Sequence, residues 1–117
     1  MIFLKNNKCE VNEKFDLKII YESNEEFKGE AIFKYYYDFV YLNKLGFEKK
    51  LEVIFQKGKN EISFFWDKFP VEGGMEVIFN CALIEISLLK DQEIYKRNLV
   101  VSIYKEDSKI KRNVIID

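Results

Sequence analysis

The chain has 117 residues, of which 48% are hydrophobic and 16% aromatic, and this apolar content excludes an intrinsically disordered protein. With 19 basic and 20 acidic side chains its formal net charge is -1, so it has no overall positive field to hold DNA, RNA or an anionic membrane. This length fits one domain, and we predict a single domain over residues 1–117.

Apolar residues recur with a period of two along the chain, which indicates strands that are buried on one face. Turn-forming residues separate these runs about every 10–15 residues, a spacing typical of a sandwich or barrel. The pattern predicts an all-β fold, an immunoglobulin-like antiparallel β-sandwich of roughly seven to nine strands. In chain order, the positions predicted to form its core are Phe15, Leu17, Ile19, Phe33, Tyr35, Val53, Phe55, Ile62, Phe64, Trp66, Val77, Phe79, Leu99, Val101 and Ile103.

Two family resemblances accompany this pattern. A strand, the turn at 57–60, the strand ending at Trp66 and a loop with Pro70 precede a strand that starts at Gly74. This order resembles the second half of immunoglobulin-like sandwiches of the CARDB type. The segment 37–40 (Tyr-Asp-Phe-Val), with Gly58 and Trp66 downstream, is similar to the intracellular proteinase inhibitors of the BsuPI type. The first resemblance implies a sandwich fold, and the second implies inhibition of a protease.

Catalytic and metal-binding patterns are absent from the sequence. There is no histidine, which removes the usual general base at neutral pH and the commonest metal ligand. The two cysteines, Cys9 and Cys81, match no zinc spacing, and no glycine-rich phosphate loop occurs. We therefore predict that the protein is not an enzyme, has no catalytic or metal site, and uses no cofactor.

The N-terminal apolar run is far too short for the core of a signal peptide. No segment approaches the roughly 18 uncharged residues of a membrane span. We therefore expect a cytoplasmic protein without a membrane contact.

The segment 33–42 is apolar on both faces, and so is the segment 75–86. An antiparallel sheet with one solvated face needs strands with only one apolar face. One interpretation is a bulge or strand break, near Asp38 and near Leu83-Ile84, that exchanges the inward and outward faces. The other is an outer face that stays apolar because a partner covers it.

The second interpretation defines a candidate interaction surface. In an immunoglobulin-like sandwich, the strands expected at 30–42, 74–86 and 96–105 lie together in one sheet. We predict that their outward residues bind another protein or a second copy of the chain, as in a homo-oligomer. These residues are Lys34, Tyr36, Ile78, Asn80, Ala82, Val100, Ser102 and Tyr104.

Two alternatives remain open. The first is an intracellular protease inhibitor that presents an exposed loop, at 43–50 or 67–74, to the enzyme. The second is a module that binds sugar or single-stranded nucleic acid through exposed aromatic residues such as Trp66 or Tyr95. Nucleic acid is disfavoured because acidic residues flank the basic ones; the densest basic segment, 109–112, is predicted to be a charged edge strand.

Overall fold

The computed structural model describes residues 1–5, 7–37, 44–70 and 81–116. Within these ranges the chain forms nine strands, which agrees with the predicted all-β fold. The strands are β1 (Ile2–Lys5), β2 (Lys8–Glu10), β3 (Phe15–Ser23), β4 (Phe27–Tyr37), β5 (Lys44–Phe55), β6 (Gly58–Trp66), β7 (Ala82–Leu89), β8 (Glu93–Glu106) and β9 (Lys109–Ile115). None of the described residues belongs to a helix long and apolar enough to cross a bilayer.

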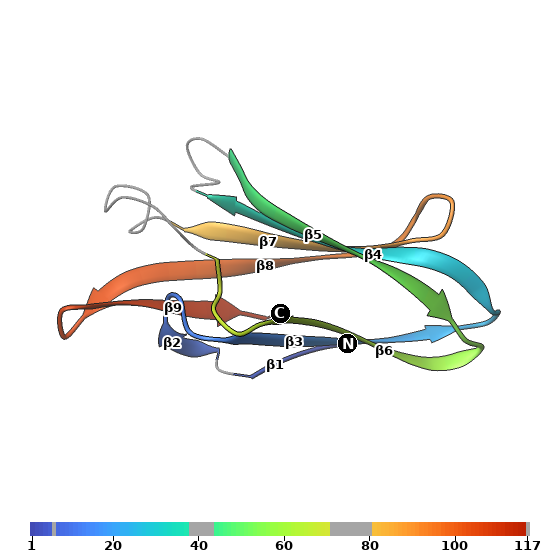
Figure 1. The fold of residues 1–117 in the computed structure, drawn as a ribbon, viewed down its shortest axis with the longest axis horizontal. Helices are drawn as coiled ribbons and strands as arrows, with labels where there is room; N and C mark the ends of the chain where they lie inside the picture. The colour runs from blue at the N-terminus through green and yellow to red at the C-terminus, as the bar shows by residue number, and fades with distance from the viewer. Residues whose placement is uncertain (6, 38–43, 71–80, 117) are drawn as a thin grey trace.

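The strands form two antiparallel sheets that pack face to face (Figure 1). The smaller sheet has the order β1-β3-β6, and the larger one has the order β2-β9-β8-β7-β4-β5. The predicted sandwich is thus confirmed. β4, β7 and β8 are neighbours in the larger sheet, as predicted for the three strands that carry the candidate surface. The N-terminal segment contributes β1 to the smaller sheet and β2 to the larger one.

The core lies between the sheets and is built by alternation along each strand. On β3, for example, Phe15, Leu17 and Ile19 are fully buried, and β3 pairs with β6 so that Leu17 lies opposite Phe64. Because successive side chains on a strand point to opposite faces, these residues fill the interior while the residues between them face outward. Phe15 also stacks on Phe69, with ring centroids 4.4 Å apart.

Most of the predicted core positions are buried. Val53 and Trp66 are only partly buried and pack against the core from β5 and from the end of β6. Val77 and Phe79 lie outside the described residues. Several buried hydrophobic residues were not predicted, and they are Ile2, Ala31, Phe69, Ala82, Ile84, Ile86, Leu88 and Val114.

The chain crosses from the larger sheet to the smaller one between β5 and β6, where a turn was expected at 57–60. Gly58 adopts a φ of 103°, a conformation that L side chains rarely adopt. Asn60 is buried and holds this connection: its Oδ1 accepts from the Gln56 N–H at 2.8 Å, and its Nδ2 donates to the Gln56 carbonyl at 2.9 Å. The amide side chain therefore satisfies the backbone where the sheet ladders end.

Of the two irregularities predicted for the larger sheet, only the one at Leu83-Ile84 lies among the described residues. The pairing of β4 with β5 shifts register between Tyr35 and Tyr36, whereas the bulge predicted near Asp38 falls outside the described residues. No shift occurs at Leu83-Ile84, since β7 pairs regularly there and its pairing with β8 shifts between Leu88 and Leu89 instead. A simple exchange of faces within the described part of β7 is thus excluded.

Candidate functional site: the outward face of the six-stranded sheet

The structure places five of the eight predicted interaction residues on the outward face of the larger sheet. Lys34 and Tyr36 lie on β4, and Val100, Ser102 and Tyr104 lie on β8, all with intermediate exposure. They alternate with the buried residues of the same strands, so their side chains point away from the core. Two further predicted residues, Ile78 and Asn80, lie outside the described residues.

Ala82 was predicted to face outward, and this prediction is wrong. Ala82 is only 1% exposed, and Ile84, Ile86 and Leu88 on the same strand are fully buried. These residues form the inward face of β7. The prediction placed the opposite set inward because it extended one alternation from residue 75 through residue 83. Leu83 therefore takes the outward position that was assigned to Ala82.

The outward residues form an apolar row across five strands. The strand registers place Tyr36 opposite Leu45 on β5 and opposite Leu83 on β7. Leu83 lies opposite Val100 on β8, and Val100 lies opposite Ile115 on β9. Directly opposed residues face the same side of a sheet, so these five side chains lie next to one another. We call Leu45, Tyr36, Leu83, Val100 and Ile115 the apolar row.

The ends of the apolar row are more exposed than its centre. Leu45 is 45% exposed and Ile115 is 49% exposed, and both belong to the few large hydrophobic residues that the described surface exposes. Tyr36, Leu83 and Val100 have intermediate exposure between them. A continuous apolar strip across a solvated sheet face is unusual for an antiparallel sandwich and is typical of a contact surface.

A row of charged residues borders the apolar row on one side. Lys34 lies opposite Glu48 on β5 and Glu85 on β7. Its Nζ is 3.9 Å from the Glu48 carboxylate, and Glu85 pairs with Lys96 at 3.6 Å. Lys34, one of the predicted interaction residues, thus belongs to a charged border of paired side chains rather than to the apolar row.

Tyr104 lies on the same face, beyond the other side of the apolar row. The Lys8 ammonium lies 5.9 Å from the centre of its ring, and the Tyr104 hydroxyl is buried without a hydrogen-bond partner among the described residues. Ser102 lies between Val100 and Tyr104 along the outward face of β8 and is paired with Asn113. These two predicted residues therefore form a polar border with β9 and β2.

The basic segment 109–112 was predicted to be an edge strand, and this prediction is wrong, because β9 lies between β8 and β2. Arg112 points inward and is fully buried. Its guanidinium donates to the carbonyls of Glu10, Val11 and Glu13 through Nη1, and to that of Lys14 through Nη2 at 3.0 Å. Arg112 thus holds the β2–β3 turn, while Lys109 and Lys111 of the same segment pair with Glu10 and Glu106.

Arg112 also packs against aromatic rings of the core. Its guanidinium carbon lies 4.9 Å from the ring centre of Phe69 and 5.4 Å from that of Phe15. Burial lowers the pKa of Arg112, because desolvation disfavours the charged form. The carbonyls and ring faces supply the negative partial charge that water would otherwise provide.

Apart from Arg112, the groups with shifted pKa values have them raised, away from the neutral range that a nucleophile or general base needs. Burial raises the pKa of the Cys9 thiol, which keeps it protonated, and burial likewise raises the pKa of Tyr35. A hydrogen bond to Glu25 raises the pKa of Lys90, and one to Glu106 raises that of Lys111. None of these four groups is activated for proton abstraction or nucleophilic attack.

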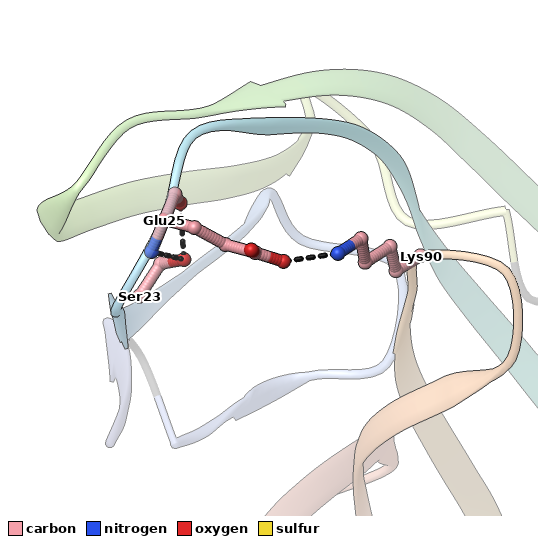
Figure 2. A network of polar contacts seen from close by, with 3 residues as sticks. All are labelled: Ser23, Glu25 and Lys90. Atoms are coloured by element: carbon pink, nitrogen blue, oxygen red, sulfur yellow. Dashed lines mark hydrogen bonds and ion pairs between the residues drawn. The ribbon is translucent and has the colours of Figure 1, made fainter.

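One end of the sandwich carries a polar network between two turns (Figure 2). The Ser23 hydroxyl donates to the Glu25 carbonyl at 2.6 Å and accepts from the Glu25 N–H, which shapes the β3–β4 turn. The Glu25 carboxylate accepts from the Lys90 ammonium, which extends from the β7–β8 turn. A hollow of about 300 Å³ lies beside this pair and is also lined by Tyr21 and Phe27. The network joins two loops that are distant in sequence.

The residues named for the two alternatives take other positions than expected. Residues 44–50 are part of β5 and do not form an exposed loop, so the loop predicted at 43–50 is wrong in its described part. In the other loop, residues 71–74 lie outside the described residues and Phe69 is only 1% exposed. Trp66 is half-buried beside Phe15, and the Tyr95 hydroxyl is buried. Neither aromatic side chain offers a fully exposed ring.

Sequence reasoning missed three members of the apolar row, namely Leu45, Leu83 and Ile115. A signal for Leu83 was present, because Glu85 and Ser87 alternate with Ile84, Ile86 and Leu88 and thereby mark the inward set. Leu45 and Ile115 follow only from the registers of β5 and β9. Such registers join residues that are far apart in sequence.

Comparisons with known proteins give the fold and no more. No protein-family model matches the chain, and no curated protein matches it. Among solved structures, β-glucuronidase 2 of Bacteroides uniformis, covalently bound to cyclophellitol-6-carboxylate aziridine, is similar with a TM-score of 0.56 and 14% identity. The match covers 88% of this chain and 13% of that chain. A sandwich similar to this one thus forms a small part of a much longer glycosidase chain.

Proposed function

We propose that this protein is a non-catalytic interaction or assembly module that binds another protein through the outward face of its larger sheet. The observation that carries the proposal is the apolar row, in which five side chains from five strands form one continuous strip. Burying such a strip against a partner would remove apolar surface from water, which is the main driving force of association.

The borders of the apolar row suit a protein partner. Interfaces commonly combine an apolar centre with a polar rim, and tyrosine is enriched in them because its ring is apolar while its hydroxyl is polar. Tyr36 lies within the row, the pairs Lys34–Glu48 and Lys96–Glu85 border it on one side, and Ser102 lies on the other. The rim can therefore give specificity while the row contributes contact area.

The chemistry of the described residues supports a non-catalytic role. The pKa values of Cys9 and Tyr35 are raised by burial, which favours their protonated and unreactive forms. The solved glycosidase contains a similar sandwich within 13% of its length, which shows that such a fold occurs as one part of a larger chain. The fold likeness does not assign a role by itself, and the proposal depends on the apolar row.

The test is to replace Leu83 with glutamate and to compare the capture of binding partners by the immobilised wild-type and Leu83→Glu proteins. We expect the variant to lose the partner, because the new carboxylate would be buried at the centre of the contact without a cation opposite it. Far-UV circular dichroism would establish that the variant is folded.

A matched control lies on the opposite sheet. Ile20 is half-buried on the outward face of β3, opposite Glu61 on β6, so Ile20→Glu introduces the same charge at a similar depth on the other side of the sandwich. We expect Ile20→Glu to retain the partner. The proposal would be wrong if both folded variants, or neither of them, lost it.

A further inference from the structure

β5 forms a long edge of the larger sheet that has no partner among the described strands. It has 12 residues (Lys44–Phe55) and is the terminal strand of that sheet, with β4 as its single neighbour among the described strands. The opposite edge of the same sheet is β2, which has only three residues. Backbone N–H and C=O groups on the outer side of a terminal strand are free to pair with another strand. β5 is therefore the longest edge that the described chain offers.

Two carboxylates oppose each other on the outward face where β5 meets β4. Glu52 lies directly opposite Glu30 on β4, and like charges in directly opposed positions are destabilising. Neither carboxylate takes part in an ion pair between described residues, although Lys28 and Lys90 line the same hollow of about 300 Å³ as both of them. Ile54, the next outward residue, is 62% exposed. A cation contributed from outside would relieve the Glu30–Glu52 repulsion.

A second copy of β5 supplies that cation in one register. If two β5 strands pair antiparallel with Leu51 opposite Leu51 of the other copy, Lys50 of each copy lies opposite Glu52 of the other. Moving the centre to Lys50 or to Glu52 places identical charges opposite each other. If the centre is Lys49, the two inward Lys49 side chains lie opposite each other, which places like charges together. The register about Leu51 alone pairs opposite charges without opposing like ones.

The inward face of β5 is also compatible with this register. Pairing about Leu51 places Phe47 opposite Phe55 of the other copy and Lys49 opposite Val53. Phe47, Leu51 and Val53 already pack against the core while remaining partly exposed at this edge. In the paired state their apolar surface would be covered by the equivalent residues of the second copy.

We propose that two copies of this chain associate edge to edge, through antiparallel pairing of their β5 strands about Leu51. The six-stranded sheets then continue from one copy into the other, related by a two-fold axis. The charges on β5 select the register and disfavour indiscriminate pairing with other strands. This contact goes beyond the proposed function, because it uses the sheet edge and leaves the apolar row free.

The experiment is a charge-reversal set, with the molar mass measured by light scattering after size exclusion over a wide range of concentrations. The wild type is expected to be a dimer at high concentration. Lys50→Glu alone, or Glu52→Lys alone, should weaken dimerisation by about tenfold or more, because two opposed pairs become repulsive in the symmetric contact. An equal mixture of the two single variants should dimerise again, as a mixed dimer with glutamates facing lysines.

The double variant K50E/E52K is the matched control. It exchanges the two charges within one chain, so its homodimer regains both opposed pairs, and we expect dimerisation near the wild-type level. It also controls for the loss of the Lys50–Glu48 ion pair, whose atoms are 3.5 Å apart in one copy. Both positions are exposed, so the fold should persist, and circular dichroism would verify this.

Two outcomes would overturn the inference. The first is a wild type that stays monomeric over the whole concentration range. The second is a wild-type dimer whose strength none of the charge variants changes, which would place the contact elsewhere. In the second case, loss of the dimer in Leu83→Glu would identify the apolar row as the contact. The proposed function would then stand while the edge contact failed.

Discussion

The two open sides of the sandwich differ in how the chain closes them. On one side the N-terminal segment crosses between the sheets, so that β1 pairs with β3 and β2 pairs with β9. Arg112 lies beneath this crossing and binds four carbonyls of the turn that follows it. On the other side β5 and β6 both end their sheets. There a lysine of β5 and a ring contact between Phe47 and Trp66 join the two edges.

That lysine is Lys49, which points inward from β5. Its ammonium donates to the Phe65 carbonyl on β6 at 3.2 Å and lies 4.8 Å from the ring centre of Trp66. An inward charge at an edge strand is one of the devices that limit uncontrolled edge pairing. The closed side therefore uses a buried cation in its internal structure, whereas the β5–β6 side ends in two edge strands at which one inward lysine disfavours indiscriminate pairing.

Among the substitutions that test this difference between the two sides, Arg112→Met is expected to have the largest effect on stability. The substitution removes the donor for four buried or partly buried carbonyls, and we expect a loss of about 3–5 kcal/mol in the free energy of unfolding. Urea unfolding followed by fluorescence of Trp66 would measure it. Lys111→Met on the same strand is the control and should change stability far less, because Lys111 makes an exposed hydrogen bond to Glu106. Equal effects of the two substitutions would contradict the role of Arg112.

A second prediction contrasts Arg112, whose guanidinium has many acceptors, with Tyr35, whose buried hydroxyl has no hydrogen-bond partner among the described residues. Burial raises the pKa of Tyr35 in the folded state, while in the unfolded chain the phenol ionises near a pKa of about 10. Above that pH the folded state binds the proton that the unfolded state has lost. Stability present below about pH 10 is therefore lost as the pH rises toward the folded pKa.

Tyr35→Phe removes this titration. We expect the variant to be as stable as the wild type at neutral pH. Above about pH 10 the free energy of unfolding should fall more steeply in the wild type than in the variant, by up to about 1.4 kcal/mol for each pH unit. Urea midpoints measured from neutral to alkaline pH would test it. Identical alkaline slopes for the two proteins would show that Tyr35 is not the group responsible.

The smallest expected effect is that of Lys49→Met on the β5–β6 side. The substitution removes one hydrogen bond and one contact between a cation and an aromatic ring, and we expect a loss of about 0.5–1 kcal/mol. Lys57→Met, at an exposed position in the β5–β6 connection, is the control and should be close to neutral. If Lys49→Met lowered the free energy of unfolding as much as Arg112→Met, the two sides would contribute equally to stability, which would contradict the difference described above.

Much of the fold could be predicted from local pattern. The alternation in 15–21, 51–55, 62–66 and 99–103 identifies strands, and β3, β5, β6 and β8 contain these segments. The neighbourhood of β4, β7 and β8 was also predicted, because sandwich folds with short connections have few arrangements. The inward face of β7 was predicted wrongly at Ala82, because the prediction extended the alternation of residues 75–83 and did not use the polar Glu85 and Ser87 that follow.

The candidate site was only partly predictable. Tyr36 and Val100 were expected on one face, and both belong to the apolar row. Leu83 lies between them, but the predicted alternation placed it on the opposite, inward face. The inward direction of Arg112 was missed as well, because a basic segment is most often solvated and nothing local marks one of its members as buried.

The sequence by itself determined the class of structure, because strand periodicity, turn residues and apolar content are properties of neighbouring residues. It also determined the near-neutral charge and the lack of histidine. The tertiary structure alone decided which strands lie at the edges, which residues face each other across them, and where the apolar row runs. Those features depend on the register between segments far apart in the chain, and a shift of one residue would exchange the buried and exposed faces of a whole strand.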